Sequence, residues 1–291
     1  MRMFVTDFQI PVALRFAELQ LVRGDWRIYD QIIDQNDNLT KRELTDSNNL
    51  VETGTVNIEE NENRVPVNYI LPPTITRENL QGTSSILQQN EQSLSLTVSN
   101  LEQDQTIGVY KNVNVDMRMF KRLKMFIHAE ELERNALNDD DLIAVIRLGS
   151  DTNDNYYQIE IPLKMTDVPN FGTSNALGAY SVWPEENNLD ISLADLTALK
   201  LTRDDIGSSS LVVYPSESSE TGVQLKIKGN PNLSNVRTIF MGIKNKEITQ
   251  KSAEIWFNEL RMSGFDNQGG WATNVSADAN IIATIFRIVG S

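Results

Sequence analysis

The stretch VQLKIKGNPNLSNVRTIFMGIKNKEITQKSAEIWFNEL, residues 223–260, decides the fold class of this chain. Its first six residues alternate Val, Leu and Ile with Gln and Lys, which is typical of a strand with one face toward solvent. Residues 236–243 and 255–260 are nearly continuous apolar runs and predict more deeply buried strands. The Gly- and Asn-rich segment 229–235 predicts a turn. The stretch therefore predicts a series of strands joined by turns.

The same patterns recur through the middle of the chain. Residues 94–98 and 123–127 alternate apolar and polar side chains, and residues 142–148 form another apolar run. Clusters of Asn, Asp and Gly punctuate the pattern at 138–141, 150–155 and 266–270. Several strands with turn signals between them favour a mainly β fold, which we predict to be a jelly-roll-like β-sandwich over residues 93–265.

Two segments have helical spacing. Apolar residues recur every three or four positions from 12 to 26, after Pro11 at a favourable first position. The second predicted helix, 193–201, follows Ser192 as N-cap, with a hydrophobic staple between Ile191 and Leu196. The prediction is therefore one or two short helices, the first within an N-terminal unit of strand and helix over residues 1–34.

Two further parts of the chain lack a clear core pattern. Residues 35–92 are polar and Pro-interrupted, and predict a long irregular N-terminal excursion that packs on the sandwich, with one hairpin around 56–70. Residues 266–291 are predicted to be a C-terminal strand or tail, because 271–280 alternates small or apolar residues with polar ones. This alternation is similar to one strand of an outer-membrane barrel. It indicates a piece of a larger membrane protein, whose tail leads toward a barrel strand.

Composition excludes several classes of site. The chain has 26 Lys and Arg against 40 Asp and Glu, a net charge of −14, which argues against a nucleic-acid surface. It has no Cys, so neither disulfides nor thiolate zinc sites can form. The single histidine, His128, ends a predicted strand and is interpreted as a packed side chain rather than a proton-transfer group. No phosphate-binding loop or nucleophile elbow occurs, so we expect no enzyme and no cofactor.

The sequence also bears on location. No apolar run approaches the roughly 20 residues that a membrane-spanning helix needs, and the N-terminus does not form a signal peptide. A complete chain of this kind is expected in the cytosol. If the chain is a piece of a longer protein, its targeting signal would lie elsewhere in that protein. The absence of Cys is equally compatible with the cell envelope.

Acidic and amide residues suggest one candidate metal site. Asp151 and Asp154 lie with Asn residues in a predicted loop, and oxygen ligands at alternate positions are what Ca²⁺ prefers. The loop lacks the later Gly and Glu of an EF-hand, so a solvated turn is the favoured alternative. Asn258 and Glu259 are further Ca²⁺ candidates, because the strand pair that ends there is similar to the last strands of carbohydrate-binding jelly rolls, near a structural calcium.

Aromatic rings on the surface of a β-sandwich could bind sugars by stacking. The candidate ligand or partner contacts are Tyr156, Trp183 and Trp271. Tyr157 shares a strand face with Ile159 and is expected in the core, which leaves Tyr156 pointing outward. The favoured alternative is that these aromatics pack at the edges of the sandwich.

Three runs toward the C-terminus resemble the SprA/Sov family, namely GNPNLSNVRTI at 229–239, IWFNELR at 255–261 and GFDNQGGWA at 264–272. Runs at 16–27, 67–73 and 110–129 agree, so the resemblance spans nearly the whole chain. In these motifs we expect Gly229 and Gly264 at turns, Arg237 and Arg261 at strand ends, and Trp256 and Phe257 on opposite faces of one strand.

The resemblance implies a role in protein export. SprA/Sov proteins form the outer-membrane translocon of the Bacteroidetes type 9 secretion system and are linked to gliding motility. The chain would then be a soluble, non-catalytic insert on the cell-surface or periplasmic side of the outer membrane. It would contact other parts of the translocon barrel, accessory proteins or secreted cargo. The family supplies no catalytic residues. The alternative is a carbohydrate-binding module that binds glycans through Tyr156, Trp183 or Trp271.

Overall fold

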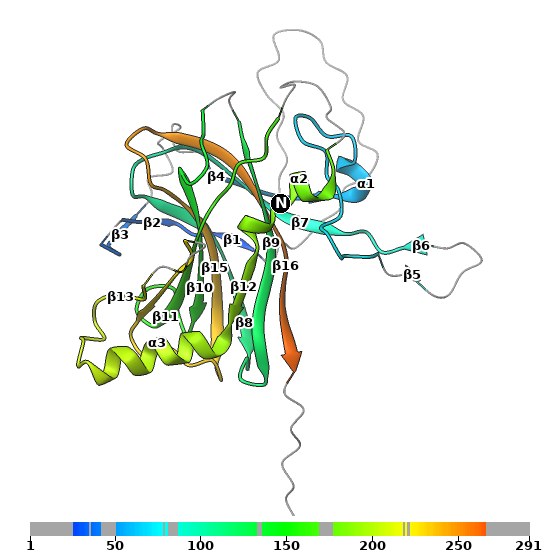
Figure 1. Cartoon of the computed structure of the whole chain (residues 1–291). Helices are drawn as coiled ribbons and strands as arrows, with labels where there is room; N and C mark the ends of the chain where they lie inside the picture. The colour runs from blue at the N-terminus through cyan, green and yellow to red at the C-terminus, as the bar shows by residue number, and fades with distance from the viewer. Residues whose placement is uncertain are drawn as a thin grey trace, which may run out of the picture.

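Two antiparallel β-sheets packed face to face form the body of the protein (Figure 1). The computed structural model describes residues 26–34, 36–41, 51–77, 79–80, 87–132, 136–168, 177–217, 219 and 222–265. The predicted mainly β class and the sandwich are confirmed. The predicted helix at 12–26 lies almost wholly outside the described residues, as does the predicted tail at 266–291.

Among the described residues, the larger sheet has nine strands. The hydrogen-bonded order of its strands is β13, β14, β11, β10, β15, β8, β2 and β3. The short strand β1 also pairs with β8. Their bounds in chain order are β1 Arg27–Ile28, β2 Gln31–Ile33, β3 Leu39–Lys41, β8 Thr106–Val115, β10 Leu142–Gly149, β11 Tyr156–Pro162, β13 Tyr214–Pro215, β14 Gln224–Lys228 and β15 Val236–Asn245.

In the part of the chain that the structure describes, the smaller sheet has five strands, in the order β12, β9, β16, β7 and β4. Their bounds in chain order are β4 Val51–Asn57, β7 Gln92–Leu101, β9 Phe120–Glu131, β12 Leu189–Ser192 and β16 Lys251–Phe265. A separate two-stranded hairpin, β5 Asn79–Leu80 with β6 Leu87–Gln88, projects from the body (Figure 1).

The main core lies between the two sheets, because alternate side chains of each strand point inward and are apolar. Leu96, Ile127 and Ile255 point inward from the smaller sheet, and Ile146 and Ile159 point inward from the larger one, all fully buried. The chain changes sheet at each step from β7 to β10, which is typical of a jelly roll. Among the described residues, no helix is long and apolar enough to cross a membrane.

The helix α3, Leu193–Asp205, confirms the second predicted helix. The Ser192 hydroxyl accepts a hydrogen bond from the Ala194 amide at 3.2 Å, which satisfies one of the free N–H groups of the first turn. Ile191 and Leu196 are both buried in the main core, as the predicted staple requires. The remaining helices are a single turn each: α1 Ile58–Asn61, α2 Ala179–Val182 and the 3₁₀ turn η1 Glu185–Asn187.

The prediction of a hairpin around 56–70 is wrong. Residues 51–57 form the regular edge strand β4, whose Val51 lies opposite Val98 of β7. Asn57 then ends the strand because its side-chain oxygen accepts hydrogen bonds from the Glu59 and Glu60 amides and caps α1. The excursion therefore contributes a strand to the smaller sheet before it crosses over that sheet's outer face.

Both outer faces of the sandwich carry small cores of their own. On the smaller sheet, Tyr69, Trp183 and Trp256 gather with buried residues of the excursion. On the larger sheet, Tyr29 and Phe240 pack edge to face at 5.5 Å beneath the β2–β3 hairpin. The sandwich is thus covered on parts of both sides.

The scaffold motifs behave mostly as expected. Trp256 packs in the outer core and Phe257 in the main core, so their opposite facing is confirmed. Gly229 follows β14 with a φ of +67°, at a point where a Cβ atom would collide with the Asp154 backbone. Gly264 also has a φ of +67°, but it lies inside β16 rather than at a turn. Arg261 likewise lies within β16 and not at its end.

Candidate interaction groove

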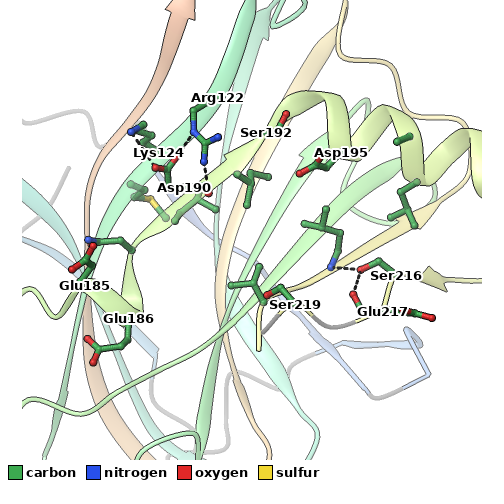
Figure 2. A pocket seen from close by; sticks show the side chains of 18 of the residues that line it. Arg122, Lys124, Glu185, Glu186, Asp190, Ser192, Asp195, Ser216, Glu217 and Ser219 are labelled. Atoms are coloured by element: carbon green, nitrogen blue, oxygen red, sulfur yellow. Dashed lines mark hydrogen bonds and ion pairs between the residues drawn. The ribbon is translucent and has the colours of Figure 1, made fainter. Parts of the chain in front are cut away.

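A groove of about 1050 Å³ opens where the two sheets end side by side (Figure 2). One wall is β12, the edge strand of the smaller sheet. The other is formed by residues 214–217, 219, 223 and 225, which include β13 at the edge of the larger sheet. Helix α3 lies alongside and contributes Asp195, Ala198, Leu199 and Thr202. The groove therefore follows the open side of the sandwich.

The lining combines an apolar base with a polar rim. Leu189, Ile191 and Leu199 are buried members of the main core that also line the groove, and Val223 and Leu225 pack against them. These apolar residues come from elements whose positions are set by the core. The base of the groove is thus part of the rigid framework, as a binding surface requires.

On the β9 side of the groove, two cations share one carboxylate. The Asp190 carboxylate accepts from Arg122 Nε at 2.6 Å and pairs with Lys124 Nζ at 3.1 Å. Burial raises the pKa of Asp190, but its two cationic partners together outweigh burial, so the pKa lies below its ordinary value. Arg122 and Lys124 of β9 are therefore both engaged by the Asp190 carboxylate of β12.

Acidic side chains dominate the rest of the rim. Glu185, Asp195 and Glu217 line the groove, are exposed, and have no ion pair within the part of the chain that the structure describes. Glu186, by contrast, pairs with Lys164 at 2.9 Å. Among the described lining residues, five carboxylates (Glu185, Glu186, Asp190, Asp195 and Glu217) face three cations (Arg122, Lys124 and Arg261), so the formal charge of the groove is negative.

Of the predicted calcium ligands, Asp151 and Asn258 are engaged in hydrogen bonds within the fold. Asp151 Oδ1 accepts hydrogen bonds from the amides of Asn153, Asp154 and Asn155, at 3.0, 2.6 and 3.0 Å, as in the solvated-turn alternative. Asn258 lies in the other sheet, where it is fully buried and donates to Ser93 Oγ at 2.7 Å. Within the described residues, no three His, Cys, Asp or Glu side chains are grouped as metal ligands. The Glu259 side chain is outside the described part of the structure.

Two of the three predicted aromatic contacts, Tyr156 and Trp183, are not surface platforms. Trp183 is fully buried and its Nε1 donates to the Ile70 carbonyl at 2.8 Å, because the excursion folds over it. Tyr156 points away from the main core as predicted, yet it too is fully buried, with the Arg147 guanidinium 4.1 Å from its ring centre. Burial raises the pKa of its phenol. Trp271 lies outside the described residues. Neither described ring can stack on a sugar, because other parts of the chain cover both.

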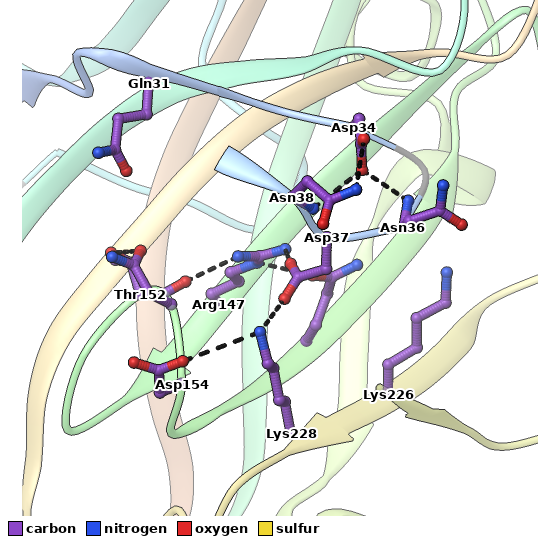
Figure 3. A network of polar contacts seen from close by, with 12 residues as sticks. Gln31, Asp34, Asn36, Asp37, Asn38, Arg147, Thr152, Asp154, Lys226 and Lys228 are labelled. Atoms are coloured by element: carbon purple, nitrogen blue, oxygen red, sulfur yellow. Dashed lines mark hydrogen bonds and ion pairs between the residues drawn. The ribbon is translucent and has the colours of Figure 1, made fainter. Parts of the chain in front are cut away.

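The cover over Tyr156 is a polar network on the larger sheet (Figure 3). Asp37, at the tip of the β2–β3 hairpin with a φ of +62°, accepts from Arg147 at 2.5 Å and from Lys228 at 2.6 Å. Arg147 also donates to Gln158 at 2.7 Å and to the Thr152 carbonyl at 2.7 Å. Its donors are used internally, so the network fastens the hairpin to the sheet.

A second buried network lies on the smaller sheet. One guanidinium nitrogen of Arg64 is 2.6 Å from Glu130 and 2.6 Å from Glu254. His128 is fully buried, with Nδ1 2.7 Å from the Val182 carbonyl and Nε2 3.5 Å from Glu130. The interpretation of His128 as a packed side chain is confirmed.

Sequence reasoning missed both the groove and the Arg64 network. The groove is assembled from β9, β12, α3 and the described residues between 214 and 225, and its acidic residues come from two separate stretches, 185–195 and 217. The only local signal was the strong start of α3, which places Asp195 at the rim. The Arg64 network joins residues 64, 130 and 254, and no spacing pattern connects them.

Comparison with known proteins adds three findings. A family model described as motility related/secretion protein matches residues 1–286. No curated protein sequence matches the chain. Among solved structures, the chain is similar to the family 11 carbohydrate-binding module of the cellulosomal cellulase Lic26A-Cel5E of Clostridium thermocellum, with 10% identity, a TM-score of 0.32, and coverage of 75% of this chain and 88% of that one. This structural likeness is too low to carry a functional argument.

Proposed function

Because this chain belongs to the SprA_N family of motility-related and secretion proteins, we propose that it is a non-catalytic interaction domain of the outer-membrane translocon of type 9 secretion. The observation that carries the proposal is the family match over residues 1–286, which includes every described strand and helix. The domain stands on the cell-surface or periplasmic side of that membrane and supports secretion and gliding motility.

The use of the charged side chains supports a non-catalytic role. Arg147, Arg64 and Glu130 are engaged in ion pairs that hold covering segments on the sheets, and His128 is sealed beneath Trp183 and Trp256. A general acid or base has to reach a substrate. These groups instead stabilise the fold.

The groove supports a docking role. It has an apolar base, a charged rim and a strand edge with one partner, and it is open to solvent along the side of the sandwich. Surfaces of this kind suit protein contacts better than small polar substrates. We assign the contact to the rest of the translocon, to an accessory protein or to secreted cargo.

The proposal is tested by replacing residues 26–265 of the parent protein with a flexible linker in the native host. We expect cargo secretion and gliding to be lost, because the docking site is removed. Immunoblotting of the outer-membrane fraction measures whether the parent protein still accumulates there. Normal secretion and motility after the deletion would overturn the proposal.

A second variant avoids any effect of the deletion on assembly. The groove double variant carries Glu185→Lys and Glu217→Lys, both exposed on the rim, and it should impair secretion at an unchanged protein level. The control double variant carries Glu52→Lys and Glu247→Lys, which make the same change of net charge at exposed residues outside the groove. Equal secretion by both variants would contradict a docking role for the groove.

A further inference from the structure

The edge strand β12 has a strand partner on one side only. It pairs with β9 through Leu189–Met125 to Ser192–Arg122, and no described strand lies on its other side. All four of its residues line the groove. An edge strand presents main-chain N–H and C=O groups along its open side, which is a template for another strand. One main-chain group of β12 is already engaged by a side chain, because the Asp190 carbonyl accepts from Arg122 Nη2 at 3.0 Å. Its sequence, LDIS, contains neither the Lys nor the Pro that commonly blocks such pairing.

The groove beside this edge has the form that an extended segment needs. Its volume of about 1050 Å³ runs past β12 toward residues 214–217 and 219. Figure 2 shows Asp190 and Ser192 on one wall with Ser216 and Ser219 on the other. Alternate side chains of an added strand would point to the apolar base and to the polar rim. Main-chain pairing supplies affinity in such complexes, and the side-chain positions supply specificity.

The charge of the rim selects the partner. Arg122 and Lys124 share the Asp190 carboxylate, whereas Glu185, Asp195 and Glu217 have no described cationic partner. With Arg261 as the third cation, the described lining holds five carboxylates against three cations. The whole chain carries a net charge of −14, so the long-range field has the same sign. Basic side chains would be attracted, and an acidic segment would be repelled.

We propose that the groove binds an extended segment of a partner protein that carries Lys or Arg and adds a strand to the free edge of β12. The proposal rests on the docking function above and names the chemistry of its partner. Basic residues of the segment face Glu185, Asp195 and Glu217. Its apolar residues cover Val223 and Leu225 at the base of the groove.

The test measures the binding of synthetic peptides to the full chain by calorimetry at low ionic strength. The probe is a short peptide in which Lys alternates with Val and Thr. Two companion peptides are an acidic version with Glu for Lys, and the basic peptide with alternate main-chain nitrogens methylated to block strand pairing. We expect the basic peptide to bind, and both companions to bind at least about tenfold more weakly. Hydrogen exchange at residues 189–192 should slow only with the basic peptide.

The two double variants separate the groove from general charge effects. Glu185→Lys with Glu217→Lys should weaken the basic peptide by about tenfold or more, and Glu52→Lys with Glu247→Lys should leave it within about twofold of the unmodified chain. The proposal is overturned by absence of binding, by equal weakening in the two variants, or by tight binding of the methylated peptide.

These outcomes are distinct from those for the proposed function. A groove double variant that impairs secretion, in a chain that does not bind the basic peptide, keeps the docking role and rejects strand addition. Peptide binding without any secretion defect supports strand addition and opposes the docking role in the translocon.

Discussion

At the scale of single residues, Arg64 determines whether the excursion can lie on the smaller sheet. It is the cation for Glu130 and Glu254, and its guanidinium lies 5.1 Å from the centre of the Trp256 ring. Burial raises the pKa of Glu130, but His128 and Arg64 together outweigh burial and hold that pKa below its ordinary value. Without Arg64, two carboxylates would be enclosed by aromatic rings with too little compensation.

We therefore expect Arg64→Met to lower the free energy of unfolding by about 3 kcal/mol, because it breaks a largely buried charge network. Urea unfolding measures the change. Arg118→Met is the matched control, because Arg118 pairs with Asp116 at 2.7 Å on the exposed surface. That control should leave the unfolding midpoint unchanged. Equal changes in the free energy of unfolding of the two variants would show that the Arg64 network stabilises the fold no more than an exposed ion pair does.

The sequence correctly predicted the direction of a side chain where it depends only on alternation along one strand. The opposite facing of Trp256 and Phe257 and the core position of Tyr157 follow from the period of two along a strand. The same rule put Tyr156 outward correctly, but it could not reveal the hairpin that covers it. That cover depends on Asp37 meeting Arg147, a contact between residues 110 positions apart.

At the scale of elements, the β2–β3 hairpin is held more by side chains than by strand pairing. Its β2 strand shares one registered pair with β8, between Ile33 and Thr106. Asp37 at its tip binds both Arg147 and Lys228. The hairpin should therefore detach locally when this carboxylate is removed.

We predict that Asp37→Ala speeds amide hydrogen exchange in β2 and β3, while exchange in β10 and β15 stays slow. The reason is that local opening of the hairpin no longer breaks a buried ion pair. Mass spectrometry of exchanged peptides measures the difference. Asp30→Ala removes an exposed carboxylate beside β2 and should leave the exchange unaltered. Unchanged exchange in Asp37→Ala would contradict a fastening role.

Elements with local signals were predictable, and those stabilised by distant contacts were not. The apolar runs identified β10, β15 and β16, and the Ser192 cap identified α3. The edge strand β4 escaped prediction because its residues, VETGTVN, alternate weakly and its pairing partner lies about forty residues further on. The groove escaped for the same reason, because it exists only after both sheet edges and α3 meet.

At the scale of the whole molecule, carboxylates with lowered pKa values tie separate parts together. Asp141 pairs with Lys251 at 2.8 Å, Glu130 pairs with Arg64, and Asp190 pairs with Arg122. Burial raises the pKa of Asp141, but Lys251 and the Asn138 hydrogen bonds outweigh burial, so this pKa is also low. The folded protein therefore holds these groups ionised at a pH where the unfolded chain takes up protons.

This linkage fixes the sign of the pH dependence. Because the folded-state pKa values lie below the unfolded ones, the stabilisation is complete above about pH 5 and is lost as the pH falls through about 4 and below. We expect the free energy of unfolding in urea to decrease steadily over that range. Lys251→Met should make the decrease shallower, because Asp141 then loses the partner that lowers its pKa. A stability that rises as the pH falls below about 4 would contradict this account.

The position of β16 also determines when the smaller sheet can form during synthesis of the chain. This strand comes last among the described elements, yet it lies between β7 and β9 in the middle of the smaller sheet. Its neighbouring residues Trp256 and Phe257 supply one core each. Until residues 256 and 257 have been synthesised, the growing chain lacks the β16 side chains of both cores, and β7 exposes an apolar face. Closing so long a loop is slow. The sandwich can therefore close only after β16 has been synthesised.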